Sequence, residues 1–180
     1  MEVVVPHLYI DTNIIVDIIE GQRRSSIHLI ETIKERGWFC STANFSMMEI
    51  LDVRKDNDYI LKKLSEGATL KYILRHRHER DLSKDTLDNV YKKVYNNFFI
   101  QYKFVKFYWL TKSGWDEAIR ICSESNISAQ DCIHLATALE AGCDILVTSD
   151  KTFKKYSAEF IKTCLPEGVN KSLRELGFEI

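Results

Sequence analysis

Short apolar runs that end near a carboxylate and then pass into a helical pattern constrain the fold of this chain more than any other feature. Residues 7–10 (HLYI) form one such run, Asp11 follows it, and the apolar residues within 14–19 recur at helical spacing. Residues 145–148 form a second run, with Asp150 behind it. Strands that alternate with helices predict a mostly parallel sheet covered on both faces, a three-layer α/β/α fold.

The same periodicities predict the rest of the chain. Further helices are expected at 25–36, 45–53, 113–125, 129–141, 151–156 and 169–176, and further strands at 38–41 and 160–164. Between about 55 and 112, two long helical patterns separated near 81–84 predict a helical hairpin inserted into the sheet-forming chain. A chain of 180 residues that is 45% hydrophobic can bury one sizeable core, so we expect a single domain over residues 1–180.

Charge is distributed unevenly along the chain. Residues 54–112 carry 14 basic and 7 acidic residues, whereas residues 1–53 carry 4 and 8 and residues 113–180 carry 7 and 11. A basic segment can hold a phosphate backbone, and Arg75, Arg77 and Arg80 are the candidate phosphate contacts because they gather near the predicted hairpin tip.

Residues 54–112 also contain 11 of the 20 aromatic residues, which could stack on exposed bases. Four of them recur at helical spacing, which favours a buried stripe or a dimer seam instead: Tyr91, Tyr95, Phe98 and Tyr102.

Several classes of protein are disfavoured. No stretch approaches the roughly 20 apolar residues that span a bilayer, and the N-terminus lacks the features of a signal peptide, so we expect a soluble, cytoplasmic protein without a membrane partner. The 5 cysteines are an odd number without a C-x-x-C pair, which argues against both a disulfide framework and a zinc knuckle.

Four acidic residues occupy similar local positions. Asp11 and Asp150 follow predicted strands, where ligands bind in open parallel sheets. Glu49 and Asp131 each lie three residues after a serine, near the start of a predicted helix, where positive helix ends favour ionised carboxylates. Four carboxylates at one sheet edge would repel one another unless cations were bound, and hard oxygen ligands suit Mg²⁺ or Mn²⁺.

Helix capping is the plain alternative for each acid taken alone. Ser46 with Glu49 fits a capping box, and the two strand-end acids can cap the helices that follow them. Capping does not account for four acids at comparable positions, whereas a metal site that hydrolyses phosphodiesters does. Asn13, Thr148 and the hydroxyl of Ser46 are candidates for orienting the carboxylates, or else turn and cap residues.

The acids and their neighbours resemble the ordered motifs of PIN-domain proteins, including the toxin nucleases of toxin–antitoxin pairs. The resemblance covers about residues 7–53 and 113–165 and is carried by residues 11–13 (DTN), 46–49 (SMME), 130–138 (QDCIHLATA) and 148–153 (TSDKTF). It implies Mg²⁺ or Mn²⁺ held by Asp11, Glu49, Asp131 and Asp150, and cleavage of single-stranded or structured RNA. It also implies a homodimer and an antitoxin partner, although the stretch between the second and third motifs is longer than in compact toxins.

Three other functions compete with a catalytic ribonuclease. A PIN-like module could bind RNA or protein without cutting, but an intact acidic quartet argues against that reading. A phosphohydrolase could use Asp11 as a covalent nucleophile, but enzymes that resemble the haloacid dehalogenases carry a second aspartate where this chain has Asn13. A dinucleotide-binding enzyme is disfavoured because no G-x-G-x-x-G follows the first strand.

Overall fold

Five parallel strands form the centre of the molecule. The structure, a computed structural model, describes residues 4–180. The strands are β1 (His7–Ile10), β2 (Phe39–Ala43), β3 (Val105–Tyr108), β4 (Ile145–Val147) and β5 (Lys162–Cys164). They lie in the order β3-β2-β1-β4-β5, and every neighbouring pair is parallel. The predicted parallel sheet is therefore confirmed, with β1 at its centre.

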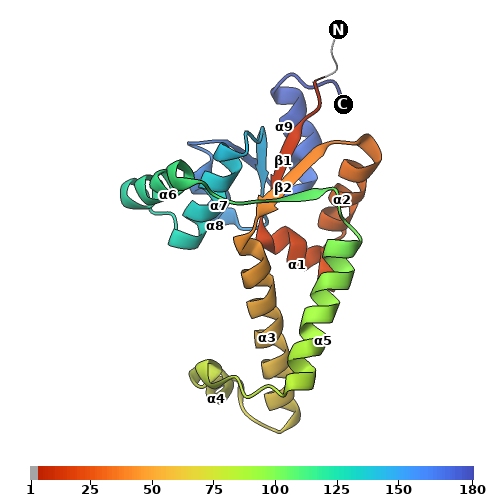
Figure 1. Cartoon of the computed structure of the whole chain (residues 1–180), viewed down its shortest axis with the longest axis vertical. Helices are drawn as coiled ribbons and strands as arrows, with labels where there is room; N and C mark the ends of the chain where they lie inside the picture. The colour runs from red at the N-terminus through yellow and green to blue at the C-terminus, as the bar shows by residue number, and fades with distance from the viewer. Residues whose placement is uncertain (1–3) are drawn as a thin grey trace.

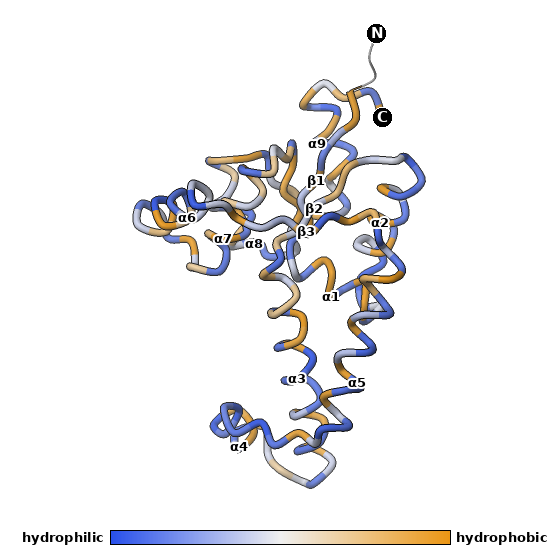
Figure 2. Tube along the Cα trace, viewed as in Figure 1, coloured by the Kyte–Doolittle hydropathy of each residue, from blue (hydrophilic) through white to orange (hydrophobic). Residues whose placement is uncertain are grey.

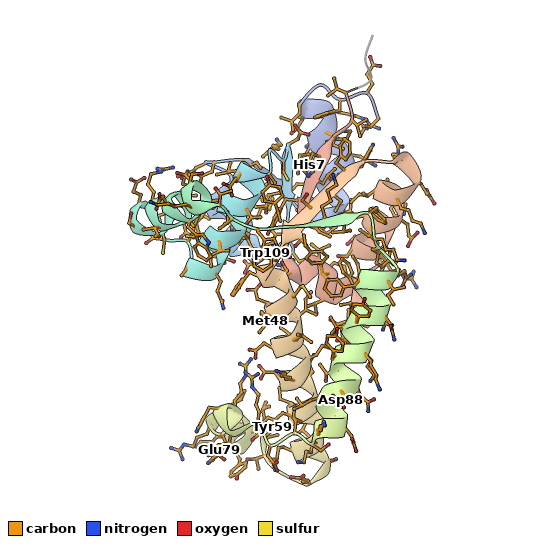
Figure 3. The ribbon with its side chains drawn as sticks, in the orientation of Figure 1. His7, Met48, Tyr59, Glu79, Asp88 and Trp109 are labelled. Atoms are coloured by element: carbon orange, nitrogen blue, oxygen red, sulfur yellow. The ribbon has the colours of Figure 1, made fainter. Side chains whose placement is uncertain are left out.

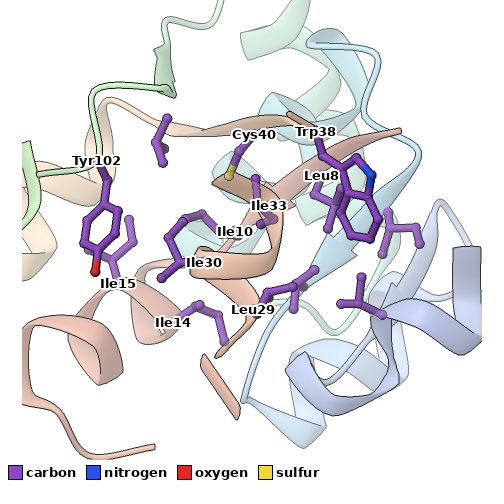
Figure 4. Packing of buried hydrophobic residues seen from close by; sticks show 14 of the residues in the cluster. Leu8, Ile10, Ile14, Ile15, Leu29, Ile30, Ile33, Trp38, Cys40 and Tyr102 are labelled. Carbon is purple, nitrogen blue, oxygen red and sulfur yellow. The ribbon is translucent and has the colours of Figure 1, made fainter. Parts of the chain in front are cut away.

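Helices cover both faces of this sheet (Figure 1). Packed on one face are α1 (Thr12–Glu20), α2 (Arg24–Arg36) and α9 (Val169–Glu175), and on the other α6 (Lys112–Glu124), α7 (Ala129–Glu140) and α8 (Lys151–Ser157). Strand β1 shows how alternation builds the two layers, because Leu8 and Ile10 enter the first core cluster while Tyr9 enters the second. Figure 4 shows the first cluster, in which Ile30 and Ile33 of α2 pack over β1.

A long helical projection leaves the edge of the sheet at which the strands end. It consists of the distal part of α3 (Phe45–Ser65), α4 (Leu70–Arg75), the 3₁₀ turn η1 (Arg77–Glu79) and α5 (Lys84–Val94), which continues into the π-helical turn η2 (Tyr95–Ile100). Figure 1 shows α3 and α5 descending side by side, with α4 at the far end. We call residues 52–94 the arm and the rest of the chain the body.

Two details of the predicted insertion are wrong. The segment 55–112 is not helical throughout, because residues 105–108 form β3, the edge strand beside β2. Its short alternating sequence, VKFY, was hidden among helically spaced aromatics. The helix expected at 45–53 and the first helix of the hairpin are also not separate, because α3 runs without a break from Phe45 to Ser65.

The aromatic stripe is only half buried. Phe98 and Tyr102 are packed in the body, as predicted, whereas Tyr91 and Tyr95 are 54% and 44% exposed and stack on each other with ring centroids 5.8 Å apart. Figure 2 shows that hydrophobic and hydrophilic positions alternate along α3 and α5. Among residues 4–180, no helix combines the length and apolar content needed to cross a bilayer.

Candidate active site

Two of the four acids stand where neighbouring strands end. Asp11 follows β1 and accepts a hydrogen bond from the Thr12 amide at 2.6 Å, capping α1. Asp150 follows β4 and caps α8 through Oδ1, which accepts from the amides of Thr152 at 2.6 Å and Phe153 at 3.1 Å. Because β1 and β4 pair in parallel, both acids lie at one edge of the sheet, as predicted.

The other two acids reach the same edge from helices. Glu49 projects from the second turn of α3, and Asp131 lies in the first turn of α7, where Ser128 caps the helix and donates to its carboxylate at 2.8 Å. A pocket of about 320 Å³ contains all four carboxylates in its wall. Its lining residues are Asp11, Thr12, Asn13, Val16, Asp17, Glu49, Val53, Gln130, Asp131, His134 and Asp150.

Asp11 is the most firmly held of the four. Its Oδ2 accepts hydrogen bonds from Asn13 Nδ2 at 2.5 Å and from Thr148 Oγ1 at 2.7 Å. Thr148 Oγ1 in turn accepts from the amide of Asp150 at 3.0 Å, which ties the two strand-end acids together. Asn13 and Thr148 therefore contact a carboxylate, as the sequence suggested.

Ser46 does not play the role that the sequence suggested. Its hydroxyl lies 2.9 Å from that of Thr42, and both are buried at the end of β2. The capping box of Ser46 with Glu49 is also wrong. Helix α3 begins at Phe45 with Asn44 in the N-cap position, so Ser46 already lies inside the helix. Ser46 thus secures the start of α3 on the sheet, and among the described contacts it reaches none of the four acids.

Glu49 is oriented by two residues that the sequence reading did not single out. His134 Nε2 lies 2.7 Å from Glu49 Oε2, and Thr12 Oγ1 donates to the same oxygen at 2.5 Å. The other ring nitrogen of His134 lies 2.7 Å from the hydroxyl of Tyr9. Ala43 N–H donates to that hydroxyl. His134 can donate from Nε2 to Glu49 when it is charged, and also as the neutral tautomer whose Nδ1 accepts from Tyr9.

A signal for His134 was present in the sequence. It lies three residues after Asp131 on α7, so both side chains face the same direction. Its partners could not be read from spacing, because they come from β1 and α3, more than eighty residues away.

Burial divides the acids into two kinds. Burial raises the pKa of Asp11, against the opposing effects of His134 and of its hydrogen bonds. Burial likewise raises the pKa of Asp131, with the negative charges of Asp11 and Asp150 adding to the effect. Burial therefore opposes ionisation of these two acids, whereas the helix end near Asp131 was expected to favour it.

Glu49 shows the opposite result. Burial would raise its pKa, but the hydrogen bond and charge of His134 and the hydrogen bond from Thr12 outweigh that effect, and the pKa of Glu49 is lowered. Burial would lower the pKa of His134, yet its contact with Glu49 and the nearby charges of Asp11 and Asp131 raise it. Glu49 and His134 therefore stabilise each other's charged forms.

The fold and the pocket agree with a family comparison. The PIN domain model matches residues 8–159, which is most of the chain. The chain belongs to the PIN domain family. PIN domains are in general nucleases, and their usual cofactors are divalent metals. A search of curated proteins finds no match.

The pocket of this PIN domain fits a divalent cation by its chemistry. Within residues 4–180, no three histidine, cysteine or acidic side chains already stand as a group that would enclose an ion. The pocket nevertheless presents carboxylate oxygens, the donors that Mg²⁺ and Mn²⁺ prefer. Burial raises the pKa of Asp11 and of Asp131, and a cation bound beside them would stabilise their ionised forms.

The arginines predicted to contact RNA lie at the far end of the arm in this PIN domain, away from the pocket. Arg75 ends α4 and is exposed. Arg77 is ion-paired with Asp56 of α3, and Arg80 Nε lies 2.8 Å from Asp56 Oδ1. Two of the three guanidinium groups are therefore already engaged within the chain.

Proposed function

We propose that this PIN domain is a metal-dependent endoribonuclease that hydrolyses RNA phosphodiester bonds. The observation that supports this most is the meeting of four carboxylates from four different elements in one pocket at the carboxyl edge of a parallel sheet. Capping accounts for the local positions of three of these acids. It does not account for their convergence on Glu49.

Each acid has a role in this proposal. Asp11, Glu49, Asp131 and Asp150 would hold one or two Mg²⁺ or Mn²⁺ ions. Bound there, such ions activate a water molecule for attack on the phosphate and stabilise the departing oxygen. Asn13 and Thr148 fix Asp11, while His134 and Thr12 fix Glu49 and keep it ionised.

Two alternatives remain in competition. Covalent catalysis by Asp11 is disfavoured, because its carboxylate is 5% exposed and accepts three hydrogen bonds, which leaves little access for an attacked phosphorus. A non-catalytic module that binds RNA or protein is favoured by one observation, the exposed apolar and basic surface of the arm.

The biological setting and partners extend the same proposal. A cytoplasmic toxin held by an antitoxin protein and a cytoplasmic RNA-processing enzyme both fit the site, and both would act on single-stranded or structured RNA. We also propose a homodimer, whose seam includes the exposed pair Tyr91 and Tyr95. Light scattering of Tyr91→Ser/Tyr95→Ser tests it: the variant should be monomeric where the wild type is dimeric, and a monomeric wild type would exclude the dimer.

The first experiment measures cleavage of labelled single-stranded and hairpin RNAs with Mn²⁺, with Mg²⁺ and with a chelator. Wild type is compared with Asp131→Asn and Asp11→Asn, and with the control Asp116→Asn, which makes the same change on the exposed surface of α6. Outer partners of a metal site already contribute about 10–100-fold to activity, so loss of a ligand should cost at least about 100-fold. The control should cut like wild type.

The outcomes separate the hypotheses. Metal-dependent cutting that vanishes in Asp131→Asn and persists in Asp116→Asn supports the nuclease. If both Asp131→Asn and Asp11→Asn still cleave RNA, the four acids are not the site of cleavage. If wild type cuts no RNA but binds it, the binding module takes precedence.

A further inference from the structure

A hollow lined by lysines lies beside the catalytic pocket. It has a volume of about 510 Å³ and runs along α8, at the side of the sheet closed by β5. Three ammonium groups line it, from Lys151, Lys154 and Lys155. The remaining lining residues are Ala158, Thr163 and Leu165, so the hollow contains no carboxylate.

The three lysines of this hollow have no acidic partner in the part of the chain that is described. The neighbouring hollow toward α9 differs, because there Lys162 Nζ lies 2.6 Å from Glu175 and Lys171 lies 3.9 Å from the same side chain. Lys151, Lys154 and Lys155 are spaced three and four residues apart on α8, where like charges repel one another. An anion in the hollow would remove that repulsion.

Helix stability alone does not explain this arrangement. Lys154 and Lys155 lie in the last turn of α8, where the helix dipole favours cations. Lys151 is the first residue of α8, where the same dipole disfavours a cation. A side chain that breaks a local rule in this way is expected at functional positions.

The hollow is placed to receive a strand that leaves the pocket. Lys151 directly follows Asp150, whose side chain lines the pocket, and Lys155 lies four residues further, about 6 Å along α8. A stacked nucleic-acid strand advances roughly 3.4 Å per nucleotide, so it would cover this length in one to two nucleotides. Asp150 and Lys151 thus adjoin at the start of α8, and the first lines the pocket while the second lines the hollow.

We propose that the hollow along α8 binds backbone phosphates of the RNA strand within one to three nucleotides of the bond that is cut. This inference rests on the proposed ribonuclease function. The pocket itself is acidic and repels a polyanion, so cations beside it are needed to retain the substrate. The arm tip is less suited to this task, because a phosphate there would displace Asp56 from Arg77 and Arg80.

The test measures binding of a labelled single-stranded RNA of about 12 nucleotides by fluorescence anisotropy, in chelator and at increasing salt. The variant Lys151→Gln/Lys155→Gln is compared with Lys34→Gln/Lys103→Gln, which removes the same charge from exposed positions at the opposite, amino edge of the sheet. Single-strand binding loses a salt slope of about 0.7 for each phosphate contact. Wild type should therefore lose about 7-fold more affinity than the hollow variant between about 50 and 200 mM salt.

Cleavage in Mn²⁺ distinguishes failure of this inference from failure of the nuclease. In the hollow variant, KM for the long RNA should rise while kcat stays within about two-fold, because Lys→Gln removes uniform binding. Equal salt slopes and equal KM in the hollow and control variants would overturn the inference even if wild type cuts RNA. If the wild type does not cut RNA but its RNA binding still depends on these lysines, the proposed ribonuclease activity is rejected, and the hollow along α8 is retained as an RNA-binding surface.

Lys154→Gln provides an independent check within the same hollow. Of the three lysines, Lys154 alone also lines the adjacent hollow. As a further phosphate contact, it should reduce the salt slope by about 0.7 when it is replaced, as either outer lysine should. A slope that changes only for Lys151→Gln would confine the effect to the catalytic pocket and overturn the assignment of the hollow.

Discussion

The carboxyl edge of the sheet and the arm differ in which side chains they bury. At the edge, Asp11 and His134 are 5% and 2% exposed, and each is hydrogen-bonded to side chains from distant elements. On the arm, large apolar side chains stand in solvent, among them Leu61 at 64% and Leu74 at 56% exposed. The edge is thus preorganised by the fold, whereas the arm leaves large apolar side chains exposed to solvent.

The two regions also differ in how they are packed. The buried residues Tyr59, Ile73 and Val90 of the arm belong to neither core cluster of the body. Figure 3 shows Tyr59 low on the arm, far from His7 of the central strand. The arm therefore has buried apolar positions outside both body clusters and joins the body core at its base, through Val94. We expect it to open more readily than the body.

The largest expected effect tests this separation. Ile30→Ala empties a fully buried position in the body and should lower the free energy of unfolding by about 2–5 kcal/mol in chemical denaturation. Ile73→Ala, which is equally buried in the arm, should lower it less and instead speed hydrogen exchange of α4 and α5. Equal global losses for the two variants would show that arm and body unfold as one unit.

The next effect concerns the ion pairs at the arm tip. Asp56 is 3% exposed and is paired with Arg77 and Arg80, whereas Asp52 is exposed and pairs with Arg80 only. Asp56→Ala should cost about 1.5–3 kcal/mol, because it removes charge-assisted contacts from a buried site. Asp52→Ala should cost less than about 1 kcal/mol. Thermal unfolding ranks the two, and a larger loss for Asp52→Ala would contradict the assignment.

The third effect returns to the catalytic edge, where His134 orients Glu49. His134→Ala should lower kcat by about 10–100-fold with little change in KM, as expected when an outer partner of a metal site is lost. His134→Gln, which keeps a donor, should restore part of kcat. A purely structural role would lower thermal stability in both variants without this rescue, so kcat is measured beside the melting temperature.

The sequence sufficed for features that depend on local order. The apolar runs before Asp11 and Asp150 predicted β1 and β4, and the parallel sheet then predicted that these two acids share an edge. Capping patterns located Asp131, because Ser128 does cap α7. These are short-range rules, and the structure agrees with them.

Features that depend on distant segments escaped that reading. Strand β3 is recognisable only by its pairing with β2, because its four residues lie among helically spaced aromatics. His134 gains its role from Tyr9 and Glu49, which approach only after α3 and α7 have packed on the sheet. The role predicted for Ser46 was wrong for the same reason. Its hydroxyl contacts that of Thr42 at the end of β2, and a capping pattern in the local sequence cannot predict this contact.

The smallest expected effect comes from the amino edge of the sheet, where the side chain of His7 is partly buried. Burial lowers the pKa of His7, and the charge of Lys106 lowers it further, against the opposing effect of Asp144. Its ring Nε2 lies 2.8 Å from the hydroxyl of Ser41 on β2. His7 therefore contributes to the fold as a neutral side chain.

The pH dependence of stability follows from this lowered pKa. In the unfolded chain His7 has a pKa of about 6.5, so below that pH the unfolded chain binds a proton that the folded chain does not. The free energy of unfolding should therefore decrease as the pH falls from about 6.5 toward the folded pKa of His7. His7→Gln should flatten that decrease, whereas His78→Gln, at a 76% exposed side chain on the arm, should not. Denaturant titrations at pH 7 and pH 5 measure the difference. RNA cleavage at pH 7 should match wild type in both variants, and a loss of cleavage in His7→Gln would show that the amino edge also supports the catalytic pocket.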